Sequence, residues 1–246
     1  MANTIKLGTN GNWATKEGSL LAYNDENNNF KPLPFTTTRA SSATVVNKQG
    51  LIETVGSGIP RIDFSDDANG ALLLEPSRSN AIQYSEDFTQ WTSINVTVNS
   101  NVANSPNGTL TADRITFDGT TNARVETTAQ GINSFEGTKV RPNSVWLKTE
   151  SGTTTVQIGS SSSFLLTVTV TQEWQRFTLN SRQGFARIRS DNATSVLAWG
   201  YQFETNGDVS LSYATSYIPT LTGTTQTRVA DTASDAGNST VINSSE

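Results

Sequence analysis

Short β-favouring runs follow one another through the middle of the chain, separated by polar or glycine-containing turns. Their spacing of roughly 8 to 12 residues is typical of a β-sandwich or barrel. No window of a dozen residues keeps an apolar face at helical spacing. The pattern therefore predicts an all-β fold, with strands over 144–149, 153–158, 164–170, 174–180 and 185–190.

Alternation along three of these runs assigns their faces, because successive residues of a strand point to opposite sides of the sheet. In each run the aliphatic residues share one phase, and the other phase holds an aromatic residue beside Lys or Arg. The aliphatic phase predicts the inward-facing residues, which are Val145, Leu147, Phe177, Leu179, Ala186 and Ile188.

The polar phase of the same runs supplies candidate binding residues. Flat aromatic rings stack on sugars while polar side chains bind the hydroxyls, and a strip of arginines suits an anionic glycan. Two other interpretations stay open: the rings can lie under a docked segment such as 72–74, and the arginines can pair with Asp or Glu across strands. The candidates for glycan binding or for a subunit interface are Trp146, Trp174, Phe185, Arg176 and Arg187, and Arg189 extends the strip.

A later run gives the clearest core prediction. Leu197, Trp199, Tyr201 and Phe203 share one phase, opposite polar residues that include Gln202 and Glu204. Strict alternation predicts that all four large residues face one core.

The texture of the chain divides it into four parts. Residues 1–35 read as an extended attachment arm rich in Asn and Gly, and residues 36–82 as short hairpins that dock on something larger. Residues 83–231 hold the sandwich, and 232–246 form a small polar tail. The arm offers few apolar anchors, and its candidates for attachment to a particle are Ile5, Leu7, Trp13, Leu20 and Leu21.

Composition narrows the possible functions. The 246 residues contain no Cys and no His, which removes thiol nucleophiles, Cys and His metal ligands and the usual proton shuttle of serine hydrolases. We therefore expect no catalytic residues, no metal and no cofactor. The formal charge of −5 disfavours nucleic acid as a partner. The start of the chain lacks the apolar run of a signal peptide, and no stretch is apolar enough to span a membrane.

An ordered series of motifs resembles the carbohydrate-binding-module-like β-sandwich of phage head spike, head fibre and tail fibre proteins. The likeness extends over roughly 36–231 and includes an upstream segment with Arg39–Val46 (RASSATVV), GLIET at 50–54, IPRIDF at 59–64 and GALLLEPSRSN at 70–80. The sandwich motifs are YSEDF at 84–88 with Trp91, PNGT at 106–109, TAD at 111–113, SVWLK at 144–148, WQRF at 174–177, WGYQFE at 199–204 and YATSYIPT at 213–220.

The resemblance implies an antiparallel jelly-roll sandwich in a non-enzymatic virion protein, a head fibre or spike assembled in the host cytoplasm and displayed on the capsid surface. Its partners would be a capsid or neck protein, further copies of itself, with a trimer favoured over a dimer, and a host or environmental glycan bound weakly. Three alternatives stay open: a tail fibre or receptor-binding protein, a tail-fibre depolymerase without its catalytic part, and a secreted carbohydrate-binding module of a glycoside hydrolase.

Overall fold

The computed structural model describes residues 3–5, 13–16, 19–24, 29–32, 36–128, 139–161, 164–182 and 184–234, with side chains from residue 36 onward except at 160–161. The chain forms two compact units. The sandwich unit is 78–227, and the other unit combines the start of the chain, up to residue 77, with residues from 228 onward. Residues 78–82 and 228–231 thus belong to different units from those that the sequence texture suggests.

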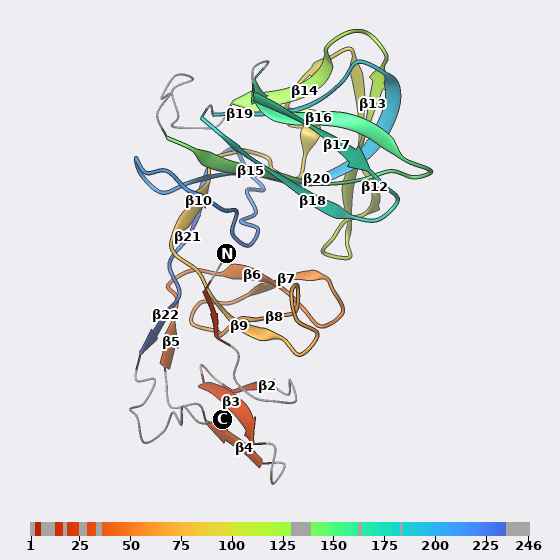
Figure 1. The fold of residues 1–246 in the computed structure, drawn as a ribbon. Helices are drawn as coiled ribbons and strands as arrows, with labels where there is room; N and C mark the ends of the chain where they lie inside the picture. Colours follow the sequence, from red (N-terminus) through yellow and green to blue (C-terminus); the bar gives the residue numbers. More distant parts are fainter. Residues whose placement is uncertain are drawn as a thin grey trace. The chain divides into compact units, whose positions relative to one another are not determined.

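The sandwich unit consists of two antiparallel sheets, which confirms the predicted fold class (Figure 1). In the seven-stranded sheet, β20 is central and pairs with β10, β13 and β15, while β12, β18 and β21 extend the sheet outward. These strands are β10 (Arg78–Asn80), β12 (Val96–Asn104), β13 (Leu110–Asp118), β15 (Arg141–Lys148), β18 (Gln175–Ser181), β20 (Ala193–Thr205) and β21 (Gln226–Arg228).

The second sheet of the sandwich has five strands in the order β11-β14-β19-β16-β17. A single 3-10 turn, η1 (Phe88–Gln90), precedes its first strand, and the Asp87 side chain caps that turn by accepting from the Thr89 N–H. The strands are β11 (Thr92–Ile94), β14 (Ala123–Thr128), β16 (Thr154–Ser161), β17 (Phe164–Val170) and β19 (Phe185–Ser190).

The core lies between these two sheets and uses the aliphatic phase of each strand. All six residues that alternation assigns inward are in it: four are fully buried, and Phe177 and Leu179 are partly buried against it. Burial of such side chains stabilises the fold by roughly 1.5 to 3 kcal/mol each. The inward faces are therefore confirmed, and they leave the opposite phase for the outer faces of the sandwich.

The prediction that Leu197, Trp199, Tyr201 and Phe203 share one face is wrong, although all four are buried. A β-bulge interrupts the pairing of β15 with β20, so that Ser144 pairs with Gln202 but Trp146 with Trp199. Gly200 occupies the bulge with a φ of +65°, a conformation that glycine adopts without strain. Tyr201 and Phe203 join the core, whereas Leu197 and Trp199 turn to the outer face.

The other unit is built from small sheets. Its strands are β1 (Asn3–Ile5), β2 (Trp13–Lys16), β3 (Ser19–Asn24), β4 (Asn29–Pro32), β5 (Thr36–Thr38), β6 (Ala43–Val46), β7 (Ile52–Val55), β8 (Ile62–Asp63), β9 (Ala71–Leu74) and β22 (Thr232–Ser234). The pairings are β1-β9-β8, β2-β3-β4, β6-β7 and β22-β5. Part of the predicted arm is therefore in paired strands, and residues near the end of the chain pair with β5.

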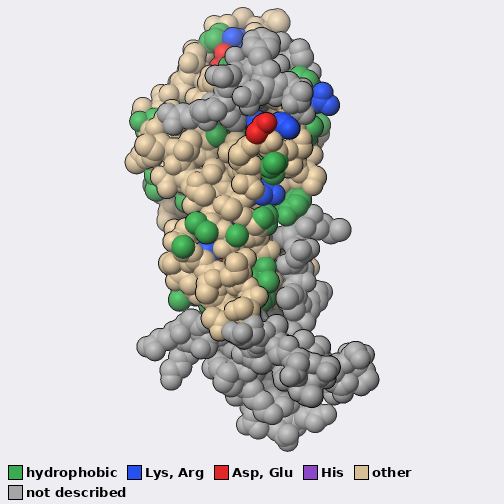
Figure 2. Space-filling model, turned by 90° about the vertical axis from the view of Figure 1, so that its left-hand side faces the viewer, with side chains coloured by type: hydrophobic (Ala, Val, Ile, Leu, Met, Phe, Trp, Pro, Cys, Tyr) green, Lys and Arg blue, Asp and Glu red, His purple; other side chains and the backbone are tan. Residues whose placement is uncertain are grey.

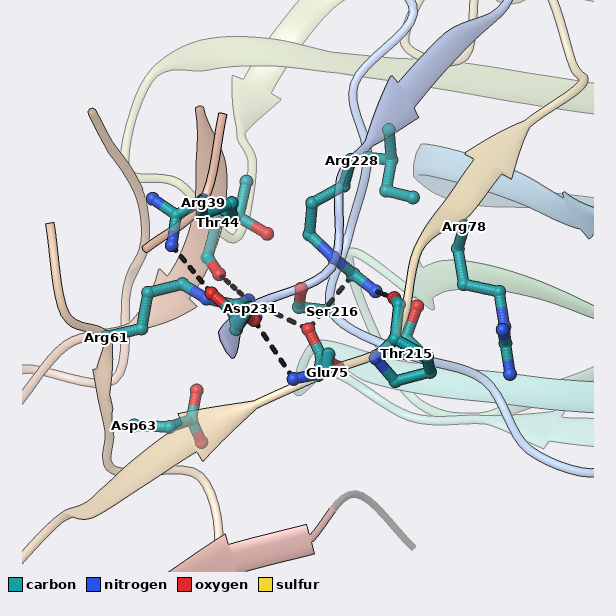
Figure 3. A network of polar contacts seen from close by, with 12 residues as sticks. Arg39, Thr44, Arg61, Asp63, Glu75, Arg78, Thr215, Ser216, Arg228 and Asp231 are labelled. Atoms are coloured by element: carbon teal, nitrogen blue, oxygen red, sulfur yellow. Dashed lines mark hydrogen bonds and ion pairs between the residues drawn. The ribbon is translucent and has the colours of Figure 1, made fainter. Parts of the chain in front are cut away.

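A buried network of ion pairs closes this unit (Figure 3). Asp231 pairs with Arg39 at 2.8 Å and also with Arg61, and Glu75 pairs with Arg61 at 2.8 Å and Arg228 at 2.9 Å. Removing one member of such a network leaves buried charges without their partner, which costs several kcal/mol. Because the partners lie as far apart as residues 39 and 231, the network ties the two ends of the unit's chain together.

In Figure 2 the described part of the chain shows apolar side chains in small separate groups, with few charged side chains between them. The described residues contain no helix with the length and hydropathy that crossing a membrane requires.

Candidate functional site

Trp146, the first glycan candidate, lies on the outer face of the seven-stranded sheet. It stands opposite Trp199 on β20 and Arg176 on β18. The Trp146 and Trp199 rings meet edge to face at 5.5 Å, and the Arg176 guanidinium lies 4.4 Å from the centroid of the Trp146 ring, a cation–π geometry. Trp146 and Arg176 are thus on the polar side, as alternation predicts, but inside a cluster.

Residues 211–220 cover that cluster. The Tyr217 ring lies 5.4 Å from Trp146 and 4.7 Å from Trp199, and Arg176 Nη1 donates to the Thr215 carbonyl at 2.7 Å. Tyr217 itself is 3% exposed. A docked segment of the chain therefore covers the rings, and this segment is 211–220, whereas 72–74 belong to the other unit.

Two polar residues of β20 hold the covering segment in place. Glu204 accepts hydrogen bonds from the Thr215 N–H at 2.7 Å and the Thr215 hydroxyl at 2.8 Å, and Gln202 Oε1 accepts from the Ile218 N–H at 2.6 Å. Both residues are fully buried, and burial of polar groups is tolerated when they are hydrogen-bonded. Gln202 and Glu204 therefore serve the fold.

The opening motif of the sandwich contacts the same segment. Ser85 Oγ and the Tyr217 hydroxyl form a 2.6 Å hydrogen bond, and Tyr217 donates to Glu86 Oε1 at 3.1 Å. The Phe88 N–H donates to Asp113 Oδ2 at 2.8 Å. Ser85 and Glu86 thus bond the covering segment through Tyr217, whereas the Phe88–Asp113 hydrogen bond lies beside the core.

Two carboxyl groups in this region have raised pKa values. Burial raises the pKa of Glu86, and the hydrogen bond from Tyr217 opposes that shift. Burial also raises the pKa of Asp113 to about 6, although Asp113 accepts from the N–H groups of Phe88 and Asn101. Both carboxyl groups accept hydrogen bonds within the chain, and burial is the largest cause of their raised pKa values.

Trp174 completes the candidates on this sheet. Its indole N–H donates to the Asn104 carbonyl at 3.0 Å, and Lys148 Nζ lies 5.5 Å from the centroid of its ring. Trp174 is partly exposed, so it is less enclosed than Trp199. The hydrogen bond fixes the ring against the end of β12.

The outer face of the five-stranded sheet presents a different set of side chains. Arg124 and Glu126 on β14 lie directly opposite Arg189 and Arg187 on β19. On the far side of β19, Gln157 of β16 lies opposite Arg189, so cross-strand pairs continue the row across three strands. These side chains alternate with core residues and keep part of their surface in solvent: the exposed fraction is 17% for Arg124, 18% for Glu126, 12% for Arg187 and 17% for Arg189.

We call this surface the arginine face, and it consists of Arg124, Glu126, Gln157, Phe185, Arg187 and Arg189. Ion pairs connect several of its side chains. Glu126 Oε2 pairs with Arg187 at 2.6 Å and with Arg124 at 3.1 Å. Arg189 Nη2 bonds both oxygens of Asp191, at 2.8 and 2.9 Å. Phe185 is two residues from Arg187 on the same strand, in the same phase, and is partly exposed.

The structure separates the predicted candidates into two groups. Trp146, Trp174 and Arg176 belong to the outer face of one sheet, and Phe185 and Arg187 to that of the other. The hypothesis that Arg176, Arg187 and Arg189 form a single strip is therefore wrong, because Arg176 is on the other sheet. The cross-strand alternative is right for Arg187, which pairs with Glu126.

Sequence reasoning missed Arg124, Glu126 and Gln157. A signal was present, because 123–128 alternates Ala and Val with Arg and Glu, as a half-buried strand does. Alternation alone does not predict which strand lies beside β14. Its neighbour β19 is about 60 positions further along the chain.

The attachment candidates lie in the first unit, where the structure gives strand positions only. Ile5 of β1 pairs with Leu72 of β9, and Trp13 of β2 pairs with Ala22. Leu20 and Leu21 are in β3, and Leu7 lies outside the described residues. Attachment to a particle stays a prediction. Within the described residues, no group of three or more Asp and Glu side chains is arranged to hold a metal ion.

Comparisons with known proteins find weak similarities to solved structures alone. No family model matches the sequence, and no curated protein matches it. Among solved structures, the chain is similar to the carbohydrate-binding module CBM29_1 from Piromyces equi (8% identity, TM-score 0.36, covering 70% of this chain and 91% of that one). It is also similar to a family 11 module from Clostridium thermocellum in complex with a mixed-linked tetrasaccharide (9%, 0.36, 55% and 98%) and to the enzymatically active domain of a bacteriophage CBA120 tailspike protein (14%, 0.33, 50% and 21%). Similarities of this size assign neither a ligand nor an activity to this chain.

Proposed function

We propose that this chain is a structural protein of a bacteriophage virion, a head fibre or spike, whose sandwich adheres weakly to surface glycans. The first unit holds the protein to the particle and the sandwich provides the adhesive surface. Many copies on one particle then turn weak individual contacts into strong overall attachment. The motif series over 36–231 supports the virion role.

The arginine face carries the adhesive part of the proposal. Arginine, glutamine and glutamate side chains stand on three adjacent strands, with Phe185 on one of them. Planar polar groups bind sugar hydroxyls, and an aromatic ring packs on the apolar side of a pyranose. Strands hold such side chains more rigidly than loops do, so less ordering is needed on binding.

Binding without turnover is the activity that these side chains support. Glycoside hydrolysis needs a pair of carboxyl groups on either side of the scissile bond, one of them protonated. The six side chains of the arginine face include one carboxyl group, Glu126, and it is ion-paired with Arg124 and Arg187. Hydrolysis of a host polysaccharide by the purified protein, lost on changing one Asp or Glu, would contradict this part.

A glycan array tests the adhesive role. We expect the purified full-length protein to bind a subset of bacterial surface glycans, and the Arg187→Ala variant to lose that binding. Arg114→Ala is the matched control, because Arg114 is in β13 of the other sheet and forms an ion pair with the exposed Glu150. Equal binding by wild type and Arg187→Ala would contradict the proposed site.

Cryo-electron microscopy of the intact phage particle tests the location. We expect density for the sandwich on the head, in groups of three copies. Density only on the tail would favour the tail-fibre alternative, and secreted protein absent from particles would favour the carbohydrate-binding module of a glycoside hydrolase. Light scattering checks the trimer in solution: a monomer at micromolar concentration and on the particle would contradict self-association.

A further inference from the structure

The pairing of β14 with β19 brings two like charges together on the arginine face. Arg124 and Arg189 are directly opposite each other in the register, and like charges in that position destabilise a sheet. The strand neighbour on the other side of Arg189 is Gln157, which is neutral. An anion between the two guanidinium groups would offset the electrostatic repulsion between Arg124 and Arg189.

The acids of this face do not balance its arginines. A single oxygen of Glu126 serves both Arg187 and Arg124. Asp191 is exposed at the end of β19, and both its oxygens bond the same nitrogen of Arg189. When Asp191 is counted with the six side chains of the arginine face, three positive charges stand against two negative charges, in a chain whose formal charge is −5.

Within the part of the chain that the structure describes, the ion pair with Asp191 leaves one donor of the Arg189 guanidinium without a partner. Its Nε is buried and, among the described residues, has no hydrogen-bond partner, whereas a guanidinium presents five N–H donors in a planar fork. A buried donor without a partner is costly. A carboxylate fits this fork with two parallel hydrogen bonds.

We propose that the Arg124–Arg189 pair binds the carboxylate of an acidic sugar, so that the glycan recognised by this protein is an anionic polysaccharide. The carboxylate lies between the two guanidinium groups, Gln157 bonds a hydroxyl of the same residue, and the Phe185 ring packs on a neighbouring sugar. This inference rests on the proposed adhesive function, and it adds the chemical class of the ligand.

Matched saccharides test the charge. We would measure binding of hexagalacturonate and of its methyl-esterified form to the full-length protein by calorimetry, at low and at physiological salt. We expect the acid to bind at least about tenfold more tightly than the ester, and salt to weaken the acid more than the ester. Equal affinity for the two forms would overturn the inference.

Variants test the residues. We expect Arg189→Gln to lose the preference for the acid, and Arg189→Lys to lose most of it because lysine lacks the planar fork. Arg114→Gln, on the other sheet, should bind like wild type, and thermal unfolding confirms that each variant is folded. An acid preference unchanged in Arg189→Gln would overturn the site.

The outcomes separate this inference from the adhesive function. If the protein binds neutral glycans through Arg187 and shows no preference for acids, adhesion stands and the anionic ligand is wrong. If it binds neither hexagalacturonate nor any acidic or neutral glycan of an array, both are wrong.

Discussion

The strands of both outer faces of the sandwich carry an aromatic residue close to a cationic one, but one face is covered by another segment of the chain and the other is partly exposed to solvent. On the seven-stranded sheet, residues 211–220 cover the Trp146 and Trp199 rings and bond Arg176. On the five-stranded sheet, Arg124, Arg187 and Arg189 keep part of their surface in solvent. An aromatic residue in the polar phase of a strand therefore indicates an outer face, and only the tertiary structure decides whether that face is covered.

The largest difference between the faces should appear on truncating Trp199, which is 1% exposed and contacts both Trp146 and Tyr217. We expect Trp199→Ala to lower the free energy of unfolding by about 3 to 5 kcal/mol. Urea denaturation followed by circular dichroism measures this. A loss below about 1 kcal/mol would mean that the outer face is not packed as described.

The raised pKa of Asp113 makes the stability of the sandwich depend on pH. The pKa of about 6 in the folded protein exceeds the ordinary value of 3.8, so the native state holds the proton more tightly than the unfolded state does. The stabilisation is full below about pH 4 and is lost as the pH rises to about 6.

We expect wild type to lose at most about 2 to 3 kcal/mol relative to Asp113→Asn across this window. Urea denaturation of both proteins at pH 4, 5, 6 and 7 measures the difference. The exposed Asp118 provides the control Asp118→Asn, which should follow wild type. Parallel curves for wild type and Asp113→Asn would contradict the shift.

The bulge that turns Leu197 and Trp199 to the outer face of the seven-stranded sheet depends on Gly200. A Cβ atom at this position would lie 3.1 Å from the Trp146 ring, and the φ of +65° strains any residue with a side chain. We expect Gly200→Ala to cost about 1 to 3 kcal/mol. Gly152→Ala, at a positive φ with open space around it, is the control for backbone strain alone and should cost less. Equal losses in the two variants would show that contact with Trp146 is unimportant.

The smallest effect on stability is expected on the arginine face. Replacing Arg187 by alanine removes its mostly buried ion pair with Glu126, but Glu126 keeps Arg124 as a partner, so we expect a loss of about 1 to 2 kcal/mol. Glycan affinity should nevertheless fall at least about tenfold. Denaturation and calorimetry on the same preparation measure both. A loss of several kcal/mol in stability would place Arg187 with the structural residues of the other sheet.

The sequence predicted the inward faces well because alternation is a local property: Val145, Leu147, Ala186 and Ile188 needed only their own strands. It failed at Leu197 and Trp199 because one additional residue in a strand reverses every face beyond it. Nor did the sequence indicate that Gln202 is buried, because its partner Ile218 is on a separate segment. For the same reason the sequence did not predict that Arg124 and Arg189, on which the proposed site rests, lie opposite each other on neighbouring strands.

Amide hydrogen exchange with a bound acidic glycan tests the functional difference between the two faces most directly. We predict added protection in 123–128 and 185–190, the strands of the arginine face, and unchanged exchange in 141–148, 175–181 and 213–220. Protection in the second set of segments, with none in the first, would contradict the account and return Trp146, Trp174 and Arg176 to the binding site.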